Sequence, residues 1–433
     1  MDPKPPRQPD PAPVWNPDSA DWDQGPAVRG VDSAHEPVPS DSSPGGPDRP
    51  RDPGRRRLIV RGLGLVGGVA LAGGLARYLL DRLTSAGTAG SVTPSGSTGG
   101  AGGGPLEATP TAPPAPLITL PPAAATVAPL AADQQLSAPE LTPLVIPNDQ
   151  FYRVDVASFP PQVDVSTWQL KVDGMVDHPQ TYSYSDLLAM PLFEQYVTLA
   201  CVSNPVGSDL IGNALWKGVR LKSILEAAGV QSGASQIVGR SVDAFTVGFP
   251  TSWALDPNRE PMIALGMNGQ PLPPEHGYPA RLIVPGLYGY VSATKWLSEI
   301  ELTTLDAFNA FWVVEGWDKY GPILTESRID HPGFGESIPA GPTWVDGLAW
   351  APDRGISRVE GRVDGGAWNQ AEMSRAISKA TWVQWMWLWQ ATTGTHTVEV
   401  RATDGTGAVQ TDQQVSAGPG GATGYHSLRV KVT

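Results

Sequence analysis

The chain has 433 residues with 43 acidic and 30 basic side chains, which gives a formal net charge of −13. This acidity argues against a general nucleic-acid-binding protein, because contacts to phosphates need clustered Lys and Arg. The single cysteine excludes an intramolecular disulfide and also the zinc, iron–sulfur and CxxCH haem sites that need several cysteines. The six histidines are scattered and include no HExxH pair, so no zinc site local in the sequence is expected.

Two segments in the first 140 residues have the composition of unfolded chain. Residues 1–54 are rich in Pro and Asp, and they bury too little apolar surface to offset the entropy of ordering. We therefore predict a disordered tail there. Residues 84–140 consist mostly of Gly, Ser, Thr, Ala and Pro, which predicts a stalk that is flexible at first and stiffer later.

Between tail and stalk, residues 55–83 carry an arginine cluster followed by an apolar run. The uncharged part, Gly62–Ala76, would be about 22 Å long as a helix, and snorkelling of Arg61 and Arg77 lengthens it toward the roughly 30 Å of a membrane core. The segment is expected to be a single N-terminal anchor in the cell membrane, with the folded domains outside the cytoplasm, or a twin-arginine-type export signal. The anchor is favoured because no small-residue cleavage site follows at once.

From about residue 141 the composition is that of a folded protein, and residues 141–310 mix short helices with strands. A helix is predicted at Leu221–Ala228 with Gly229 as its C-terminal stop, and Ser185 is expected to cap a short helix that ends at Pro191. Strands are expected at Trp168–Val172, Tyr196–Cys201, Val242–Phe249, Arg281–Val284 and Trp296–Leu302. This mixture lacks regular alternation and predicts an α+β domain.

A Trp- and Gly-rich connector is expected at residues 311–337, and residues 338–433 change character again. Arg358–Val363 and Thr397–Ala402 alternate as strands do, and Asp-Gly turn sequences follow both of them. Short strands with turn signals and little helix predict a β-sandwich. Three tryptophans fall on one face of a strand: Trp385, Trp387 and Trp389. Packing in the sandwich core is the favoured interpretation, and stacking on a sugar or another ring is the alternative.

The residue of greatest chemical interest is Cys201, which follows a β-like run and precedes a polar Asn-Pro turn. A lone cysteine is most often an inert buried side chain, but strand-to-turn junctions often carry functional groups. A thiolate there has two uses, as a nucleophile or as a ligand of a soft metal ion. The nucleophile needs a base, for which His276 is the candidate. The metal needs a cofactor that brings its own sulfurs.

Five groups of motifs follow one another between Asn148 and about Thr304. They are Phe151-Tyr152-Arg153, Leu199-Ala200-Cys201-Val202-Ser203-Asn204, Trp216-Lys217-Gly218-Val219-Arg220-Leu221, His276-Gly277-Tyr278-Pro279-Ala280-Arg281 through Val284-Pro285-Gly286, and Thr294-Lys295-Trp296-Leu297. In order and approximate spacing they resemble the sulfite oxidase family of molybdopterin-dependent oxidoreductases. The resemblance implies a molybdopterin-binding α+β domain with mixed sheets. Residues 338–433 resemble the family's immunoglobulin-like dimerisation domain, which makes a homodimer an expected assembly.

The same resemblance implies a cofactor, Mo-molybdopterin, and roles for particular residues. Molybdenum in this family is held by the dithiolene sulfurs of the pterin, by oxo groups and by one cysteine, which would be Cys201. Cys201 and Arg153 are the implied catalytic residues. The implied cofactor-binding residues are Tyr152, Arg153, Cys201, His276, Arg281, Ala293, Thr294 and Lys295. Of these, Arg281, Lys295 and the backbone around Ala293 would hold the phosphate of the pterin.

The sequence departs from the sulfite oxidases where their substrate binds. Gly289–Thr294 lacks the arginine that those enzymes carry before the Lys-Trp pair, and Asn204-Pro205-Val206 replaces their Asn-Arg-Arg. Asp155 stands where a histidine is usual. A pocket with fewer cations and an added carboxylate should hold sulfite poorly, unless Arg220 or Arg240 supplies the missing charge.

These observations predict an extracytoplasmic molybdenum oxidoreductase that moves an oxygen atom to or from a small oxo-acceptor or oxo-donor. No haem-attachment motif is present, so electrons are expected to pass to a separate carrier. The alternative is a cell-surface binding module that keeps the fold without the cofactor. The joint presence of Cys201, His276, Arg281 and Lys295 favours the enzyme.

Overall fold

The computed structural model describes residues 15–16, 21–22, 119–138, 141–157 and 159–433. The chain divides into two compact units, Met1–Ala115 and Pro116–Thr433. In the first unit, β1 (Trp15–Asn16) pairs antiparallel with β2 (Asp21–Trp22), within the segment expected to be disordered. The rest of that tail, the expected anchor at 55–83 and most of the expected stalk lie outside the described residues. Within the described part of the chain, no helix is long and apolar enough to cross a membrane.

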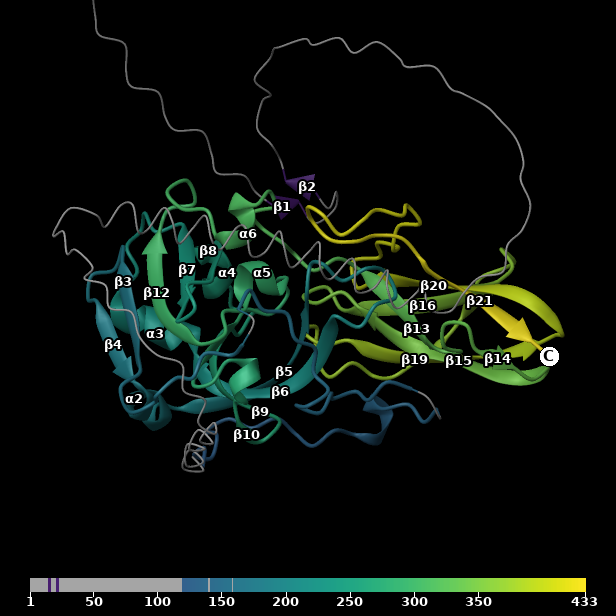
Figure 1. The fold of residues 1–433 in the computed structure, drawn as a ribbon, viewed down its shortest axis with the longest axis horizontal. Helices are drawn as coiled ribbons and strands as arrows, with labels where there is room; N and C mark the ends of the chain where they lie inside the picture. Colours follow the sequence, from purple (N-terminus) through teal and green to yellow (C-terminus); the bar gives the residue numbers. More distant parts are fainter. Residues whose placement is uncertain (1–14, 17–20, 23–118, 139–140, 158) are drawn as a thin grey trace, which may run out of the picture. The chain divides into compact units, whose positions relative to one another are not determined.

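Two five-stranded sheets form the first part of the second unit (Figure 1). One sheet has the order β10-β9-β6-β5, with β11 also paired to β9, and all its pairs are antiparallel. Its strands are β5 (Leu192–Ala200), β6 (Ile211–Arg220), β9 (Met262–Met267), β10 (Gln270–Pro271) and β11 (Arg281–Ile283). The connection between β5 and β6 carries Cys201, which lies one residue beyond the end of β5.

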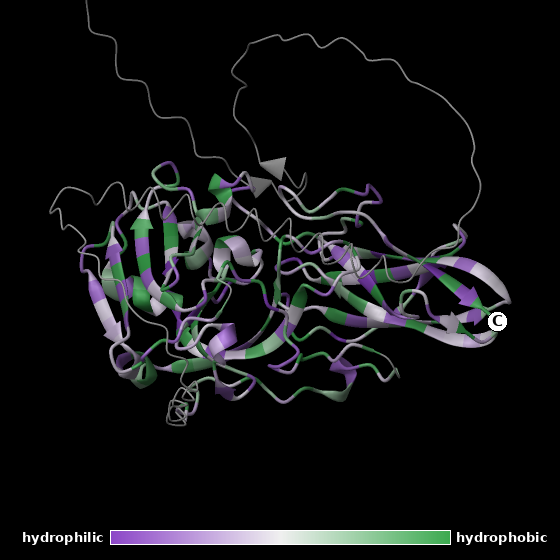
Figure 2. Ribbon diagram, viewed as in Figure 1, coloured by the Kyte–Doolittle hydropathy of each residue, from purple (hydrophilic) through white to green (hydrophobic). Residues whose placement is uncertain are grey.

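The other sheet has the order β4-β3-β12-β7-β8, in which β12 runs parallel to β3 and the remaining pairs are antiparallel. Its strands are β3 (Gln169–Gly174), β4 (Gln180–Ser183), β7 (Gln236–Ser241), β8 (Thr246–Pro250) and β12 (Leu297–Thr303). Hydrophobic and hydrophilic residues alternate along β3 and β12, as expected for strands with one face in the core (Figure 2). The parallel pair makes this a mixed sheet.

Short helices connect and cover these strands. They are η1 (Ala132–Gln134), α2 (Tyr184–Ala189), α3 (Leu221–Ala228), α4 (Thr251–Leu255), η2 (Pro274–His276), α5 (Gly289–Ser292) and α6 (Phe311–Val314). The α3 helix has the predicted bounds and ends at Gly229, whose φ of 68° suits a residue without Cβ. The α2 helix is capped by Ser183 and not by the expected Ser185. The Ser183 hydroxyl accepts the Asp186 N–H at 3.2 Å, and the Asp186 carboxylate accepts the Ser183 N–H at 2.8 Å.

The segment Val242–Phe249, expected to be one strand, is a turn followed by β8. The sequence pattern did not predict β7, the strand that precedes this turn. Ala244 has a φ of 69°, and its N–H donates to the Ser241 carbonyl at 3.1 Å. The Asp243 carboxylate accepts the N–H of Phe245 at 3.2 Å. This side-chain cap closes a tight turn inside a segment whose apolar residues are typical of a strand.

The C-terminal part is a sandwich of two sheets, with the orders β13-β15-β19-β18 and β14-β21-β20-β16-β17. The first comprises β13 (Glu326–His331), β15 (Gly341–Trp350), β18 (Glu372–Met373) and β19 (Val383–Ala391). The second comprises β14 (Ser337–Ile338), β16 (Ile356–Val363), β17 (Asn369–Gln370), β20 (Gly394–Asp404) and β21 (His426–Val432). Because β13 pairs with β15, part of the expected connector belongs to the sandwich.

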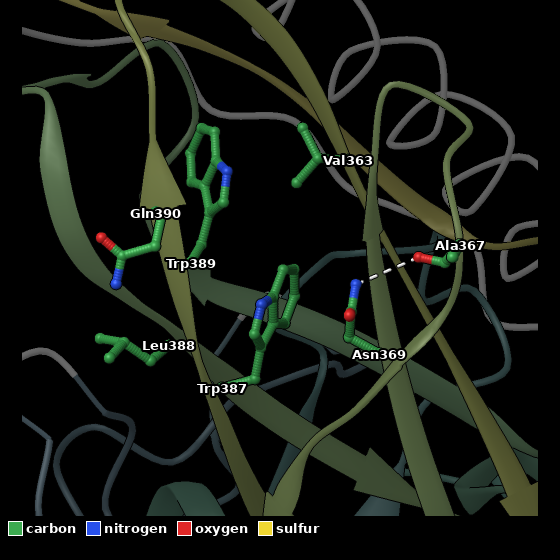
Figure 3. Close-up of a pocket in the computed structure, with 7 residues that line it drawn as sticks. All are labelled: Val363, Ala367, Asn369, Trp387, Leu388, Trp389 and Gln390. Carbon is green, nitrogen blue, oxygen red and sulfur yellow. Dashed lines mark hydrogen bonds between the residues drawn. The ribbon is translucent and has the colours of Figure 1, made fainter.

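The tryptophan stripe lies on the inner face of β19. Trp385 is fully buried, and Trp387 and Trp389 are 8% and 9% exposed, whereas Leu388 and Gln390 point to the opposite side of the strand (Figure 3). Trp387 and Trp389 line a cavity of about 330 Å³ that also touches β16 and β17. This burial agrees with the packing interpretation.

One hydrophobic core cluster of the first part extends to Leu348, Trp350 and Trp382 of the C-terminal part, while the sandwich encloses a separate cluster between its two sheets. Trp382, just before β19, is buried in the same cluster as Leu170 and Leu282. Its backbone N–H donates to the Thr198 hydroxyl at 2.9 Å, and its indole N–H donates to the Leu144 carbonyl at 2.9 Å. Trp382 therefore joins the sandwich to β5, the strand that leads to Cys201.

We predict that Trp382→Ala lowers the free energy of unfolding of the full chain by about 3–5 kcal/mol, because it leaves a large cavity and removes the buried hydrogen bond from the indole N–H to the Leu144 carbonyl. Urea unfolding measures the loss. The matched control is Trp344→Ala on β15, where the side chain is 39% exposed, and this change should cost well under half as much. Equal losses for the two variants would contradict the assigned role of Trp382.

Glu326 at the start of β13 is a buried carboxyl, and burial raises its pKa from 4.5 to about 8. The folded protein therefore holds this proton more tightly than the unfolded chain, and stability that is fully present below about pH 4.5 is lost as the pH rises through 8. We predict that Glu326→Gln matches the wild type near pH 4.5 and is more stable at pH 8.5, by on the order of 2–4 kcal/mol. Urea unfolding at the two pH values tests this, and a gap that does not grow with pH would contradict it.

Candidate functional site

Cys201 is fixed by the tight connection between β5 and β6. Its N–H donates to the Leu210 carbonyl at 2.9 Å, and its own carbonyl accepts the Asn204 N–H at 3.1 Å. The Asn204 side-chain oxygen accepts the Leu210 N–H at 2.9 Å, which closes the loop. The thiol lies 2.9 Å from the Ser203 hydroxyl, and burial raises its pKa. A neutral thiol is the expected state in the absence of a metal, since coordination deprotonates a thiol outright.

Two consecutive segments of the chain, one leading into β11 and one between α5 and β12, lie side by side. The Leu282 N–H donates to the Thr294 carbonyl and the Leu297 N–H to the Ala280 carbonyl, both at 2.9 Å. The Trp296 N–H donates to the Gly277 carbonyl at 3.2 Å. These backbone bonds align the segment from His276 to β11 with the segment from α5 to β12. They thereby bring together the segments that carry His276, Arg281, Thr294 and Lys295.

A third segment, around Asn148 and Tyr152, closes the site. The His276 Nε2–H donates to the Asn148 carbonyl at 2.7 Å, which leaves Nδ1 as an acceptor. Burial lowers the pKa of His276, so the neutral ring is favoured. Phe151 packs edge-on against His276, with ring centroids 5.6 Å apart. Tyr152 lies within electrostatic reach of Cys201 and Arg281, and burial raises the pKa of its hydroxyl.

Several buried polar atoms at these positions have no hydrogen-bond partner among the described residues. They are Arg281 Nε, the Thr294 hydroxyl and the Asn204 side-chain nitrogen. Burial lowers the pKa of Arg281 to about 10, and its guanidinium lies 5.2 Å from the centroid of the Trp216 ring. Each unpaired buried group costs about 1–3 kcal/mol, and a bound polar ligand is one source of the missing partners.

Lys295 is 9% exposed and forms an ion pair with Asp155. Its ammonium also donates to the Glu275 carbonyl at 3.1 Å. Burial and the charge of Arg153 lower the pKa of Lys295 to about 7, while the Asp155 carboxylate favours the charged form. The other Asp155 oxygen lies 3.4 Å from the Arg153 guanidinium, which is 45% exposed.

The structure also gives specific contacts for two other expected site residues, Ala293 and Arg153. The Ala293 N–H already donates to the Gly289 carbonyl at 2.9 Å, so it is not the free backbone donor expected there. Arg153 lies 3.4 Å from Asp155 and within electrostatic reach of His276 and Lys295. Two arginines considered as substitutes for missing cations are engaged elsewhere, because Arg220 pairs with Glu260 and Arg240 pairs with Glu301.

The sequence motifs gave no role to Tyr288 or to the amide of Asn204. Tyr288 is buried, and its pKa is raised by burial, by Glu326 and, more weakly, by Cys201. It therefore lies within electrostatic reach of the thiol. Its signal in the sequence is weak, because Tyr288 lies in a stretch with few polar residues. The sequence signal for Asn204 was stronger, because Asn204 lies three residues after Cys201 in the same motif.

Within the described residues, no three His, Cys, Asp or Glu side chains are grouped so that they could hold a metal ion by themselves.

Comparison with known proteins identifies the fold and the cofactor. The family model described as "Oxidoreductase molybdopterin binding domain" matches residues 157–312. Mitochondrial sulfite oxidase of Homo sapiens is 28% identical over 273 residues, which cover 53% of this chain and half the length of that protein. YuiH of Bacillus subtilis (strain 168), an uncharacterized oxidoreductase, is 35% identical over 166 residues, 38% of this chain and 80% of YuiH.

Among solved structures, the sulfane dehydrogenase SoxCD of Paracoccus pantotrophus superposes with a TM-score of 0.59. The match covers 69% of this chain and 83% of the SoxCD chain at 22% identity, which establishes a shared fold. The chain belongs to the sulfite-oxidase-like family of molybdopterin-binding oxidoreductases, and its cofactor is Mo-molybdopterin.

Proposed function

We propose that this chain transfers an oxygen atom to or from a small substrate outside the cytoplasm and exchanges electrons with a separate carrier. The observation that carries the proposal is the position of Cys201, a single buried thiol at the end of a strand. Tyr152 lies within electrostatic reach of both this thiol and Arg281. When bound, the molybdenum cofactor supplies the redox and oxygen-transfer chemistry. The residues of the chain bind it, orient it and set the charge around it.

The residues around Cys201 fit the groups that molybdopterin presents. Cys201 would provide the protein sulfur to molybdenum. The Arg281 Nε and the Thr294 hydroxyl, both buried without partners, would donate to the phosphate, with Lys295 beside them. The free Nδ1 of His276 accepts a hydrogen bond, which suits a donor on the pterin ring. The unpaired buried atoms are therefore explained by the ligand that the family binds.

The charge around the site favours a substrate less anionic than sulfite. Arg153 is an exposed cation that directly follows the site residue Tyr152 in the sequence. Its guanidinium is partly neutralised by Asp155. Arg220 and Arg240 are held in ion pairs with glutamates. A dianion would gain little attraction here and would be repelled by the carboxylate. Neutral oxo-donors such as sulfoxides and N-oxides fit this charge distribution better.

The proposals on location and electron transfer rest on the sequence. Residues 55–83, with Arg55 and Arg56 before an apolar run, support an anchor or an export signal outside the described residues. The single cysteine and the absence of a CxxCH motif support a separate electron carrier. A homodimer through residues 338–433 stays a prediction.

We predict that Cys201→Ser reduces the molybdenum content of the purified full chain at least fivefold, because the thiolate that anchors the metal is lost. Metal analysis after expression in a cofactor-competent host measures the content. Ser203→Ala is the matched control, since it removes the hydroxyl 2.9 Å from the thiol but keeps the thiol. Full molybdenum and activity in Cys201→Ser would refute the ligand assignment. A wild-type chain without molybdenum would favour the cofactor-free binding module.

We predict that kcat/KM for sulfite is at least tenfold lower than for the best neutral sulfoxide or N-oxide. Steady-state assays of the molybdenum-loaded chain with artificial electron donors and acceptors compare the substrates. If sulfite is the best of them, the substrate proposal is wrong, while the assignment to the family is untouched.

A further inference from the structure

Asp155 is in an unusual position for an acidic residue, because it contacts Lys295, the cation that is expected to bind the phosphate of the cofactor. Its side chain is 9% exposed and forms an ion pair with Lys295, whose side chain is 10% exposed. Asp155 is also 3.4 Å from Arg153. Among the described residues, no other carboxylate lies within ion-pair distance of Lys295.

We propose that Asp155 is an internal counter-anion of the cofactor site, which neutralises Lys295 in the cofactor-free protein and gives up this ion pair when a phosphate group binds. The proposal rests on the role of Lys295 in holding the phosphate. It makes Asp155 a positioning residue, because Asp155 acts through Lys295.

Burial explains why Lys295 needs a partner before the cofactor arrives. A buried ammonium without a counter-charge is strongly destabilising, and the Glu275 carbonyl is a neutral acceptor that satisfies one of its three protons. The Asp155 carboxylate supplies the opposite charge. Arg281, in contrast, has no ion pair within the described chain, but its pKa stays near 10, so it remains charged without help.

A bound phosphate and the Asp155 carboxylate compete for the same ammonium. Two anions on one buried cation repel each other, and the repulsion is large where water is scarce. The surroundings of Asp155 allow its side chain to move away from Lys295 when a phosphate binds. Residues 152–157 form no helix or strand, and Val154 beside it is 44% exposed. Asp155 can therefore leave Lys295 without breaking regular backbone hydrogen bonds, and Arg153 remains as its partner.

The test is phosphate binding to the cofactor-free full chain, produced in a host that cannot make molybdopterin. Inorganic phosphate is titrated by calorimetry at pH 6, below the pKa of about 7 that burial and Arg153 give Lys295. We expect Asp155→Asn to bind phosphate at least tenfold more tightly than the wild type, and Asp155→Glu to bind like the wild type. The matched control is Asp149→Asn, an exposed carboxylate on the same segment, which should change nothing.

Thermal unfolding of the same proteins provides a second readout that a merely structural role would not produce. Without phosphate, Asp155→Asn should unfold at a lower temperature than the wild type, because Lys295 loses its counter-charge. Saturating phosphate should close most of this gap. The double variant Asp155→Asn, Lys295→Met should lose the gain in phosphate affinity.

Three results would overturn the proposal: phosphate binding that is equal or weaker in Asp155→Asn, a gain that survives Lys295→Met, and no phosphate binding in any variant. Each would make Asp155 a structural ion-pair partner. The molybdenum content of the wild-type chain, measured in parallel, is independent of these results. It therefore separates failure of this proposal from failure of the proposed function.

Discussion

The candidate site depends on the backbone hydrogen bonds that hold two consecutive segments of the chain side by side. The bonds from Leu282 to Thr294 and from Leu297 to Ala280 set the segment that contains Arg281 against the segment that contains Lys295. Without this alignment, the cations would lie on separate elements and could not act on one anion. Backbone bonds are suited to the task because they are short, directional and buried. Tyr152, which lies within electrostatic reach of both Arg281 and Cys201, links these segments to the thiol at the end of β5.

The site keeps its charge by two different means. Arg281 is buried without an ion pair and remains protonated because the guanidinium has a high intrinsic pKa. Lys295 has a lower intrinsic pKa, and it is held by the Asp155 carboxylate. The positive charge of Arg281 is therefore always available to a ligand. The positive charge of Lys295 is available only when the ion pair with Asp155 is broken. The same carboxylate reduces the attraction for anionic substrates near Arg153.

Residue patterns predicted the parts of the fold that follow local rules. The α3 helix and its stop at Gly229 follow from apolar spacing and from the left-handed conformation that glycine adopts easily. The alternation around Trp387 predicted a buried face in the sandwich. The turn at Asp243 could not be read from the pattern, because a side-chain hydrogen bond to Phe245 overrides the strand propensity of its neighbours. The pairing of β13 with β15 depends on contacts distant in the sequence.

The same distinction applies to the site. Motif order identified Cys201, His276 and Arg281, because each lies in a short run of characteristic residues. Spacing alone could not show that the Ala293 N–H is used within α5, nor that Tyr288 lies near the thiol. The first is a hydrogen bond that closes the short α5 turn, and the second depends on the tertiary position of Tyr288.

The most direct test of the central claim is to count the sulfur atoms bound to molybdenum. The chain has one cysteine, so a protein thiolate on the metal can come only from Cys201. Molybdenum K-edge X-ray absorption on the full chain, purified from a cofactor-competent host, gives the number of neighbouring sulfurs. The account predicts three, two from the dithiolene of the pterin and one from the protein. A value of two would contradict it.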